Sequence, residues 1–206
     1  MEQNEVLKAL QRDHAAELKL AAERLKGTAR HTEIIPSKVL SDMTGHEILL
    51  KPENLQVTGS FKIRGAYNKI ASLSDEQLAR GIVTASAGNH AQGVALAATR
   101  RGIKSIVCMP DGAPIMKVEN TKNLGAEVCL VPGTYDDAHD KAVELQEETG
   151  MTFIHPYDDE QVIAGQGTIG LEILDQLPDL DAVIVPVGGG GLISGVAFAS
   201  RACARK

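Results

Sequence analysis

The sequence predicts an α/β fold in which a parallel sheet is flanked by helices, and three observations predict it. Between residues 81 and 149, short apolar runs alternate with longer segments of helical periodicity, a pattern typical of parallel strands with helical crossovers. Glycine-containing segments directly follow two apolar runs, at the strand ends where α/β proteins bind ligands. Aromatic residues make up only 3% of the chain, without Trp, so the expected core is aliphatic.

The elements before residue 81 are predicted from periodicity and capping residues. Apolar residues at helical spacing predict one or two helices over residues 7–25, ending near Gly27. A short apolar run predicts a strand over residues 47–51. Ser60 is a candidate N-cap for a helix over residues 61–72, because a serine hydroxyl accepts hydrogen bonds from the N–H groups of a first helical turn.

Three strand–helix units follow in the centre of the chain. The predicted strands cover residues 81–85, 104–109 and 126–131, and the predicted helices cover residues 89–101, 115–124 and 136–149. Each strand precedes its own helix, so right-handed crossovers between parallel strands are expected.

A second region begins near Phe153. It predicts a helix over residues 160–176, a buried strand over residues 182–187, four consecutive glycines, and a helix from Leu192 onward. No strand follows that would continue the new layer, so the chain is expected to be a fragment of a longer fold.

Composition and charge exclude several classes of protein. A length of 206 residues fits one large domain or two small ones. With 21 Lys and Arg against 27 Asp and Glu, the net charge is -6, which disfavours nucleic-acid binding through a general basic surface. An apolar content of 43% supports a core rather than intrinsic disorder.

Targeting and redox signals point to the cytoplasm. No apolar run approaches the ~20 residues that span a bilayer, and the N-terminal 25 residues lack the apolar core of a signal peptide. The three cysteines are odd in number and widely spaced, so they are expected to be reduced thiols. No metal site and no membrane partner are expected.

Residues 165–170 match the GxGxxG pattern of dinucleotide-binding loops letter for letter. The context does not fit, because acidic residues precede the pattern where a strand is required, and no acid follows about 20 residues later. We interpret these glycines as positions where a helix packs closely against a neighbour.

The four glycines at residues 188–191 have a better context, between a predicted strand and a predicted helix. Glycine backbone N–H groups and the helix N-terminus that follows them would form a phosphate cradle. The segment lacks the Gly-Lys-Ser/Thr of a P-loop, so a nucleoside triphosphate is not favoured. An ordinary turn is the alternative.

Two further segments carry candidate functional residues. Residues 86–93 follow a predicted strand and open a helix, where backbone N–H groups with Ser86 and Asn89 could hold a carboxylate. A structural hydrogen bond is the alternative for His90. Lys62 lies in the first turn of a predicted helix, where the helix dipole and burial would lower the pKa of its amine and favour a nucleophile. A solvated surface lysine is the alternative there.

These segments, in this order, resemble the pyridoxal-phosphate (PLP) enzymes of the tryptophan synthase β-like fold. Within that fold the chain is similar to the threonine dehydratases (threonine ammonia-lyases) of the serine/threonine dehydratase family. The resemblance runs from about residue 18 to residue 200 and rests on residues 59–66, 86–93 and 188–192, with support from residues 28–32, 50–55 and 165–168.

The resemblance implies a role for each site residue. Lys62 would hold PLP as a Schiff base and act as the catalytic base, and Phe61 would border the cofactor. Asn89 would hydrogen-bond the phenolic oxygen of PLP. The phosphate would be cradled by Gly188, Gly189, Gly190, Gly191 and Leu192, and the substrate carboxylate side would be lined by Ser86, Gly88, Asn89 and His90.

The implied reaction is β-elimination of L-threonine to 2-oxobutanoate and ammonia, in isoleucine biosynthesis or threonine catabolism, with L-serine to pyruvate as a further reaction. A serine-preferring dehydratase and an inactive fragment that at most binds PLP are the alternatives. Serine racemases carry a second acid–base hydroxyl where this chain has Ala87, and a methyl group cannot transfer a proton, so a racemase is disfavoured.

Members of the family are considerably longer than this chain. The resemblance implies two lobes, with residues 1–54 and 156–206 in a large PLP domain that is incomplete at its C-terminus, and residues 55–155 in a small α/β domain. PLP would lie between the lobes, and the complete protein is expected to be a homo-oligomer with a small-molecule amino-acid substrate.

Overall fold

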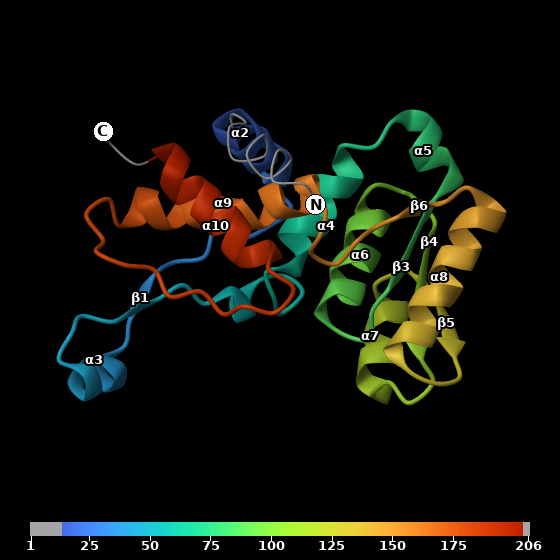
Figure 1. The fold of residues 1–206 in the computed structure, drawn as a ribbon, viewed down its shortest axis with the longest axis horizontal. Coiled ribbons are helices and arrows are strands. Elements are labelled where there is room, and N and C mark those ends of the chain that lie inside the picture. Colours follow the sequence, from blue (N-terminus) through green and yellow to red (C-terminus); the bar gives the residue numbers. More distant parts are fainter. Residues whose placement is uncertain (1–13, 204–206) are drawn as a thin grey trace, which may run out of the picture.

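The computed structural model describes residues 14–203, which form two groups of elements lying side by side (Figure 1). One group is built on a four-stranded parallel sheet of order β5-β4-β3-β6. Its strands are β3 (Ile82–Ala85), β4 (Ser105–Pro110), β5 (Glu127–Val131) and β6 (Thr152–Phe153). Its helices are α5 (Asp75–Arg80), α6 (Asn89–Arg100), α7 (Ile115–Asn123) and α8 (Tyr135–Thr149).

The sheet is covered by helices on both faces, because alternate residues of each strand point to opposite sides. On β4, Ile106 and Cys108 pack with Ala138 of α8. The intervening Val107 and Met109 pack with residues of α6 and α7. The predicted aliphatic core and the predicted strand–helix order of residues 81–149 are confirmed, and the sheet and its helices form the α/β fold that the sequence predicts.

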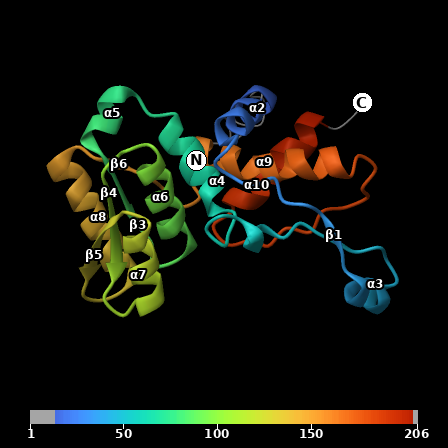
Figure 2. The same cartoon turned by 180° about the vertical axis from the view of Figure 1, so that it is seen from behind.

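The second group of elements is helical. It contains α2 (His14–Leu25), α4 (Lys62–Ala71), α9 (Glu160–Gln176) and α10 (Gly191–Cys203). Helix α9 packs against α2, α4 and α10. Of these helices, α4 lies nearest the sheet, as the two opposite views show (Figures 1 and 2). The helix predicted over residues 7–25 is confirmed from His14 onward, and its first part lies outside the described residues.

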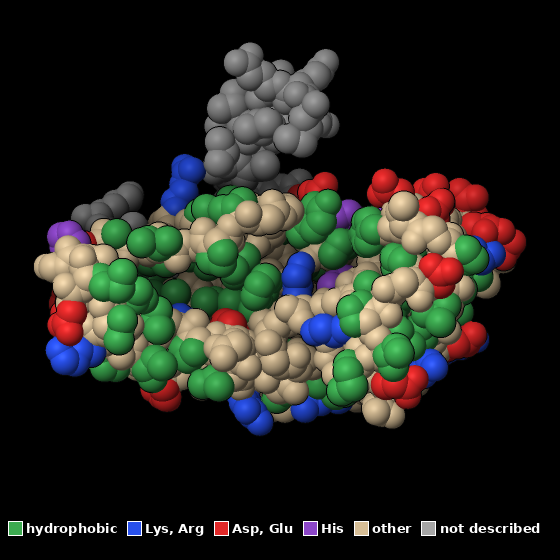
Figure 3. Space-filling model, turned by 90° about the horizontal axis from the view of Figure 1, so that it is seen from below, with side chains coloured by type: hydrophobic (Ala, Val, Ile, Leu, Met, Phe, Trp, Pro, Cys, Tyr) green, Lys and Arg blue, Asp and Glu red, His purple; other side chains and the backbone are tan. Residues whose placement is uncertain are grey.

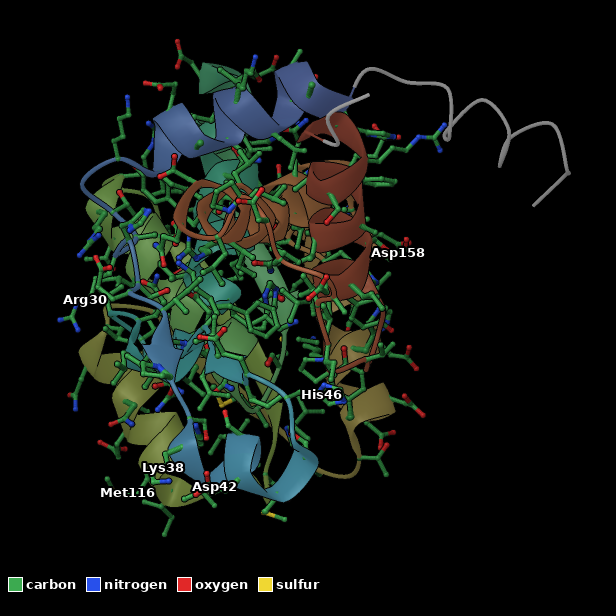
Figure 4. The ribbon with its side chains drawn as sticks, turned by 90° about the vertical axis from the view of Figure 1, so that its left-hand side faces the viewer. Arg30, Lys38, Asp42, His46, Met116 and Asp158 are labelled. Atoms are coloured by element: carbon green, nitrogen blue, oxygen red, sulfur yellow. The ribbon has the colours of Figure 1, made fainter. Side chains whose placement is uncertain are left out.

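A small extension projects from the helical group. Strands β1 (Ile35–Pro36) and β2 (Leu49–Leu50) pair in antiparallel fashion around α3 (Lys38–Thr44), and the 3-10 helix η1 (Glu53–Leu55) follows. None of the residues of α3 is buried. Lys38 and Asp42 lie one turn apart on α3 and form an ion pair of 2.7 Å (Figure 4). The sequence prediction found β2 and missed both β1 and α3.

Two predictions are wrong. Ser60 does not cap α4: Phe61 occupies the N-cap position with helical backbone angles, and the buried Ser60 hydroxyl has no hydrogen-bond partner among the residues that the structure describes. Residues 182–187 do not form a buried strand, since no strand of the described chain pairs with them and Ile184 is 92% exposed. An apolar run becomes a strand only where another strand supplies its hydrogen bonds.

Figure 3 views the molecule from below, and hydrophobic side chains gather around a hollow on that face.

None of the helices between residues 14 and 203 is long and apolar enough to cross a membrane.

Candidate functional site

A pocket of about 310 Å³ lies where the two groups of elements meet. Its volume is at the lower end of the range for small-molecule sites, roughly 300–1,000 Å³. Four parts of the chain form its wall: the start of α4, the segment after β6, one residue of α9, and the glycine segment that leads into α10. The lining residues are Phe61, Lys62, Pro156, Tyr157, Gln166, Pro186, Val187, Gly188, Gly189, Gly190, Gly191 and Leu192.

Lys62 is the first residue of α4, and its side chain forms part of the pocket wall. The Nζ atom donates a 2.6 Å hydrogen bond to the carbonyl oxygen of Pro156. It lies 5.4 Å from the centre of the Phe61 ring. Burial lowers the pKa of the Lys62 amine below its ordinary value, so more of the amine is neutral and nucleophilic at a given pH. The prediction of a half-buried lysine at a helix start is confirmed.

Close packing by α6 fixes the start of α4. Gly93 of α6 faces the backbone at Lys62, and a Cβ at Gly93 would lie 3.1 Å from the carbonyl oxygen of Lys62. A larger residue at 93 would push the two helices apart. The glycine therefore holds the Lys62 backbone against α6, next to the carboxyl end of β3.

The glycine segment supplies the opposite wall of the pocket. Gly190 has a φ of 88°, a backbone conformation that side-chain-bearing residues rarely adopt. No atom lies within 4 Å of the position that a Cβ would take at Gly188 or Gly190. A Cβ at Gly189 or Gly191 would collide with Tyr157. The segment thus presents open backbone to the pocket, immediately before the N-terminus of α10.

Gln166 of α9 was not singled out by the sequence analysis, yet it lines the pocket and is 1% exposed. Its Oε1 atom accepts a 3.1 Å hydrogen bond from the backbone N–H of Gly65. Its Nε2 atom is buried and has no hydrogen-bond partner among residues 14–203. A buried donor without a partner is rare in folded proteins. In the sequence, the only signal that could have drawn attention to Gln166 is its place within the glycine pattern of residues 165–170.

The loop after β3 and the first residues of α6 hold the four residues predicted to face the substrate carboxylate, and none of them lines the pocket. The Ser86 hydroxyl accepts a hydrogen bond from the N–H of Gly88 at 3.3 Å. The exposed Asn89 accepts one from Lys117 Nζ at 3.3 Å. The roles of Ser86, Gly88, Asn89 and His90 toward a ligand stay predictions.

His90 is held by a structural hydrogen bond, the alternative that the sequence left open. Its Nε2 atom lies 3.0 Å from the carbonyl oxygen of Ile154. A carbonyl only accepts, so in the neutral ring Nε2 carries the proton. The buried Nδ1, which has no partner in the described part of the chain, is then unprotonated. Burial lowers the pKa of His90 to about 3, with the charges of Lys62 and His155 acting in the same direction. His90 is therefore neutral at pH 7.

A buried ion cluster holds α4 and α9 together behind the pocket. The Arg64 guanidinium contacts Glu53 at 2.8 Å and Glu172 at 2.5 Å, and Glu172 also contacts Lys51 at 2.6 Å. Arg64 is 1% exposed. Burial alone would raise the pKa of Glu172, but the hydrogen bonds and charges of Arg64 and Lys51 outweigh it and lower that pKa. The cluster fixes the orientation of the Lys62 helix, and sequence analysis did not find it.

The glycines of the GxGxxG match are packing positions, as the sequence context predicted, although they lie within α9 rather than at its start. A Cβ at Gly165 would lie 2.6 Å from the carbonyl oxygen of Arg64 in α4. A Cβ at Gly167 or Gly170 would meet the backbone of α10, at Gly195 and Val196. Helix α9 therefore touches both the Lys62 helix and the helix that follows the glycine segment.

Over residues 14–203, no group of three or more His, Cys, Asp or Glu side chains is placed to hold a metal ion. Cys108 and Cys129 are free thiols that face each other across β4 and β5.

Comparisons with known proteins agree on one family. A sequence family described as "Pyridoxal-phosphate dependent enzyme" matches residues 25–206. The L-threonine ammonia-lyase of Thermotoga maritima is 58% identical over 185 residues, which cover 90% of this chain and 46% of that protein. The catabolic L-threonine dehydratase TdcB of Staphylococcus aureus is 54% identical over 182 residues, covering 88% and 53%. The chain thus spans about half the length of these curated relatives.

Solved structures share the fold. Processed threonine deaminase isoform 2 from Solanum lycopersicum superposes with a TM-score of 0.88 at 41% identity, covering 99% of this chain and 54% of that one. Maize serine racemase superposes with a TM-score of 0.88 at 43% identity, covering 91% and 57%.

Proposed function

This chain belongs to the pyridoxal-phosphate dependent enzyme family, and on that basis we propose that it carries the PLP site of a threonine ammonia-lyase. The reaction would convert L-threonine into 2-oxobutanoate and ammonia. The observation that supports this most is the pocket in which a buried lysine amine faces an open glycine segment. The names of the relatives at 58% and 54% identity point to the same substrate.

The residues of the pocket fit PLP. A lysine amine with a lowered pKa is available for its aldehyde carbon. The open backbone at Gly188 and Gly190, with the N-terminus of the 13-residue α10, suits a phosphate. Lys62 would hold the cofactor with Phe61 at its border, and the phosphate would rest on Gly188, Gly189, Gly190, Gly191 and Leu192. Asn89, which is exposed and lies outside the lining of the pocket, is the residue that the family resemblance assigns to the phenolic oxygen.

When bound, PLP supplies an electron sink for the negative charge that develops at the substrate α-carbon. The protein supplies the proton transfer and the orientation. Because burial lowers the pKa of the Lys62 amine, more of the amine is neutral and able to accept the α-proton at a given pH. Backbone N–H groups at the start of α6, that of His90 among them, would hold the substrate carboxylate together with the Ser86 hydroxyl and the Asn89 amide. The His90 ring adds no donor, because its one N–H faces the carbonyl oxygen of Ile154. The β-hydroxyl leaves as water, and one water is taken up later when ammonia is released. The overall reaction therefore converts one threonine into one 2-oxobutanoate and one ammonia.

A PLP-binding chain without turnover is the second candidate, and one observation favours it. Residues 182–187, which lead into the glycine segment, are unpaired and largely exposed. A phosphate site at the end of an unpaired segment is less rigid than one at the end of a sheet strand. Racemisation has weaker support, because Ala87 has no hydroxyl and packs on the core cluster of α6 and β4.

The test is a PLP titration of the 206-residue chain, followed by borohydride reduction and peptide mapping. We expect one adduct, at Lys62, and none there in the variant Lys62→Ala. The exposed Lys104, which pairs with Glu127 at 3.3 Å, provides the matched control Lys104→Ala, which should keep the Lys62 adduct. Adducts scattered over surface lysines would contradict the site. Assays of 2-oxobutanoate from threonine and pyruvate from serine then separate turnover from binding, and threonine from serine preference.

A further inference from the structure

Gln166 is placed between the two halves of the pocket. Its helix, α9, contacts α4 through Gly165 and α10 through Gly167. Gln166 therefore lies between the helix that begins with Lys62 and the helix that follows the glycine segment, and it lines the pocket that both enclose.

The orientation of the Gln166 amide is set by its neighbour. The N–H of Gly65 can only donate, so the Gln166 atom 3.1 Å away must be the carbonyl oxygen Oε1. The other end of the amide is then the NH₂ group. This group is buried, has no partner among the described residues, and belongs to a side chain that lines the pocket. A buried amide donor without a partner has lost its hydrogen bond to water and gained none in return, so a ligand acceptor at this position would recover that loss.

We propose that Gln166 is a binding residue for the phosphate of PLP, to which its Nε2 donates a hydrogen bond. This inference rests on the proposed function. The other candidate anion donors of the same pocket are the backbone N–H groups of the glycine segment and the N-terminus of α10, and all of them favour an anion. Gln166 adds a side-chain donor from a third element, α9, which fixes the anion relative to Lys62.

The test compares PLP with pyridoxal, which lacks the phosphate, using spectroscopic titration rather than turnover. The variant Gln166→Glu keeps the shape of the side chain and an acceptor for Gly65, but replaces the donor with a negative oxygen. We expect its Kd for PLP to rise about tenfold or more, as for loss of a charge-assisted hydrogen bond. Its Kd for pyridoxal should change less than about twofold.

A matched control lies on the same helix. Gln161 is outside the pocket and is held by Arg24 and Asn68, so Gln161→Glu should leave both affinities unchanged. Circular dichroism and melting temperature establish that each variant is folded. A measurement on the unaltered chain needs no variant: in ¹H–¹⁵N spectra, the side-chain amide signal of Gln166 should shift on adding inorganic phosphate or PLP.

The outcomes separate this inference from the proposed function. If the unaltered chain gives no Lys62 adduct, the proposed function fails and the inference fails with it. If the adduct forms but Gln166→Glu binds PLP and pyridoxal in the same ratio as the unaltered chain, only the inference is overturned. An amide signal of Gln166 that stays unchanged with phosphate and with PLP would also overturn it.

Discussion

The side-chain nitrogen of Lys62 lies 2.6 Å from the carbonyl oxygen of Pro156, 94 residues further along the chain. This hydrogen bond joins the first turn of α4 to the segment that leaves β6. It holds the amine at the pocket wall instead of in solvent. Because the same burial lowers the pKa of the amine, Lys62 should differ from the surface lysines in a measurable way.

The first prediction concerns the reactivity of Lys62. Reductive methylation of the chain with formaldehyde, followed by mass spectrometry across a pH series, should give half-maximal reactivity of Lys62 at a pH below its ordinary pKa of 10.5. A pKa lowered by one unit gives about tenfold more neutral amine at pH 8. A Lys62 profile centred at or above pH 10.5 would contradict the lowered pKa.

The second prediction concerns the ion cluster. Arg64→Met removes the guanidinium from the buried Glu53 carboxylate and leaves Glu172 with Lys51 alone. Removal of one member of a buried pair costs about 3–5 kcal/mol. Urea unfolding should show this loss. The matched control is Arg80→Met, because the Arg80–Glu76 pair is exposed, at 41% and 83%, and should cost less than about 1 kcal/mol. Equal losses in the two variants would refute a structural role for the cluster.

The third prediction follows from His90. Its folded pKa of about 3 lies below its ordinary value of 6.5, so below pH 6.5 the unfolded chain binds a proton that the folded chain does not. The free energy of unfolding should therefore fall as pH decreases from 6.5 toward 3, by up to about 1.4 kcal/mol per pH unit from this group. His90→Gln can still donate to Ile154 and does not titrate, so its unfolding free energy should depend less on pH. Parallel curves for the two proteins would exclude a buried neutral His90.

The fourth prediction concerns helix packing. Gly165→Ala places a Cβ 2.6 Å from backbone atoms of α4, which cannot move as a side chain can, so we expect a loss of about 1–3 kcal/mol in the free energy of unfolding. Gly112→Ala is the control, because no atom lies within 4 Å of its Cβ position. Thermal melts followed by circular dichroism would detect the difference, and a melting temperature in Gly165→Ala as high as in Gly112→Ala would count against the close contact.

Sequence reasoning worked where the determining interactions are local. The strands and helices of residues 81–149 follow from apolar periodicity. Lys62 and residues 188–191, which line the pocket, were found from short motifs at helix starts. It failed for residues 182–187, because an apolar run is a strand only if a partner pairs with it. The prediction that Ser60 caps α4 failed because Phe61 has helical backbone angles and occupies the N-cap position.

The residues that sequence reasoning missed act across long separations. Arg64 and Glu172 are 108 residues apart, and Gly65 and Gln166 are 101 residues apart. No local pattern pairs them, since each contact exists only once α9 has packed on α4.

The glycines of α9 also set a register between distant parts of the pocket. Gly165 meets α4, and Gly167 and Gly170 meet α10, so α9 cannot slide along its axis by one residue without bringing a side chain against a neighbouring backbone. The number of residues between these contacts on α9 therefore sets how far the lysine end of the pocket lies from the glycine end. A single-residue insertion between Gly165 and Gly167 would rotate the α10 contacts by about 100° relative to α4. Such an insertion would misalign the two half-sites while leaving every pocket residue in the sequence.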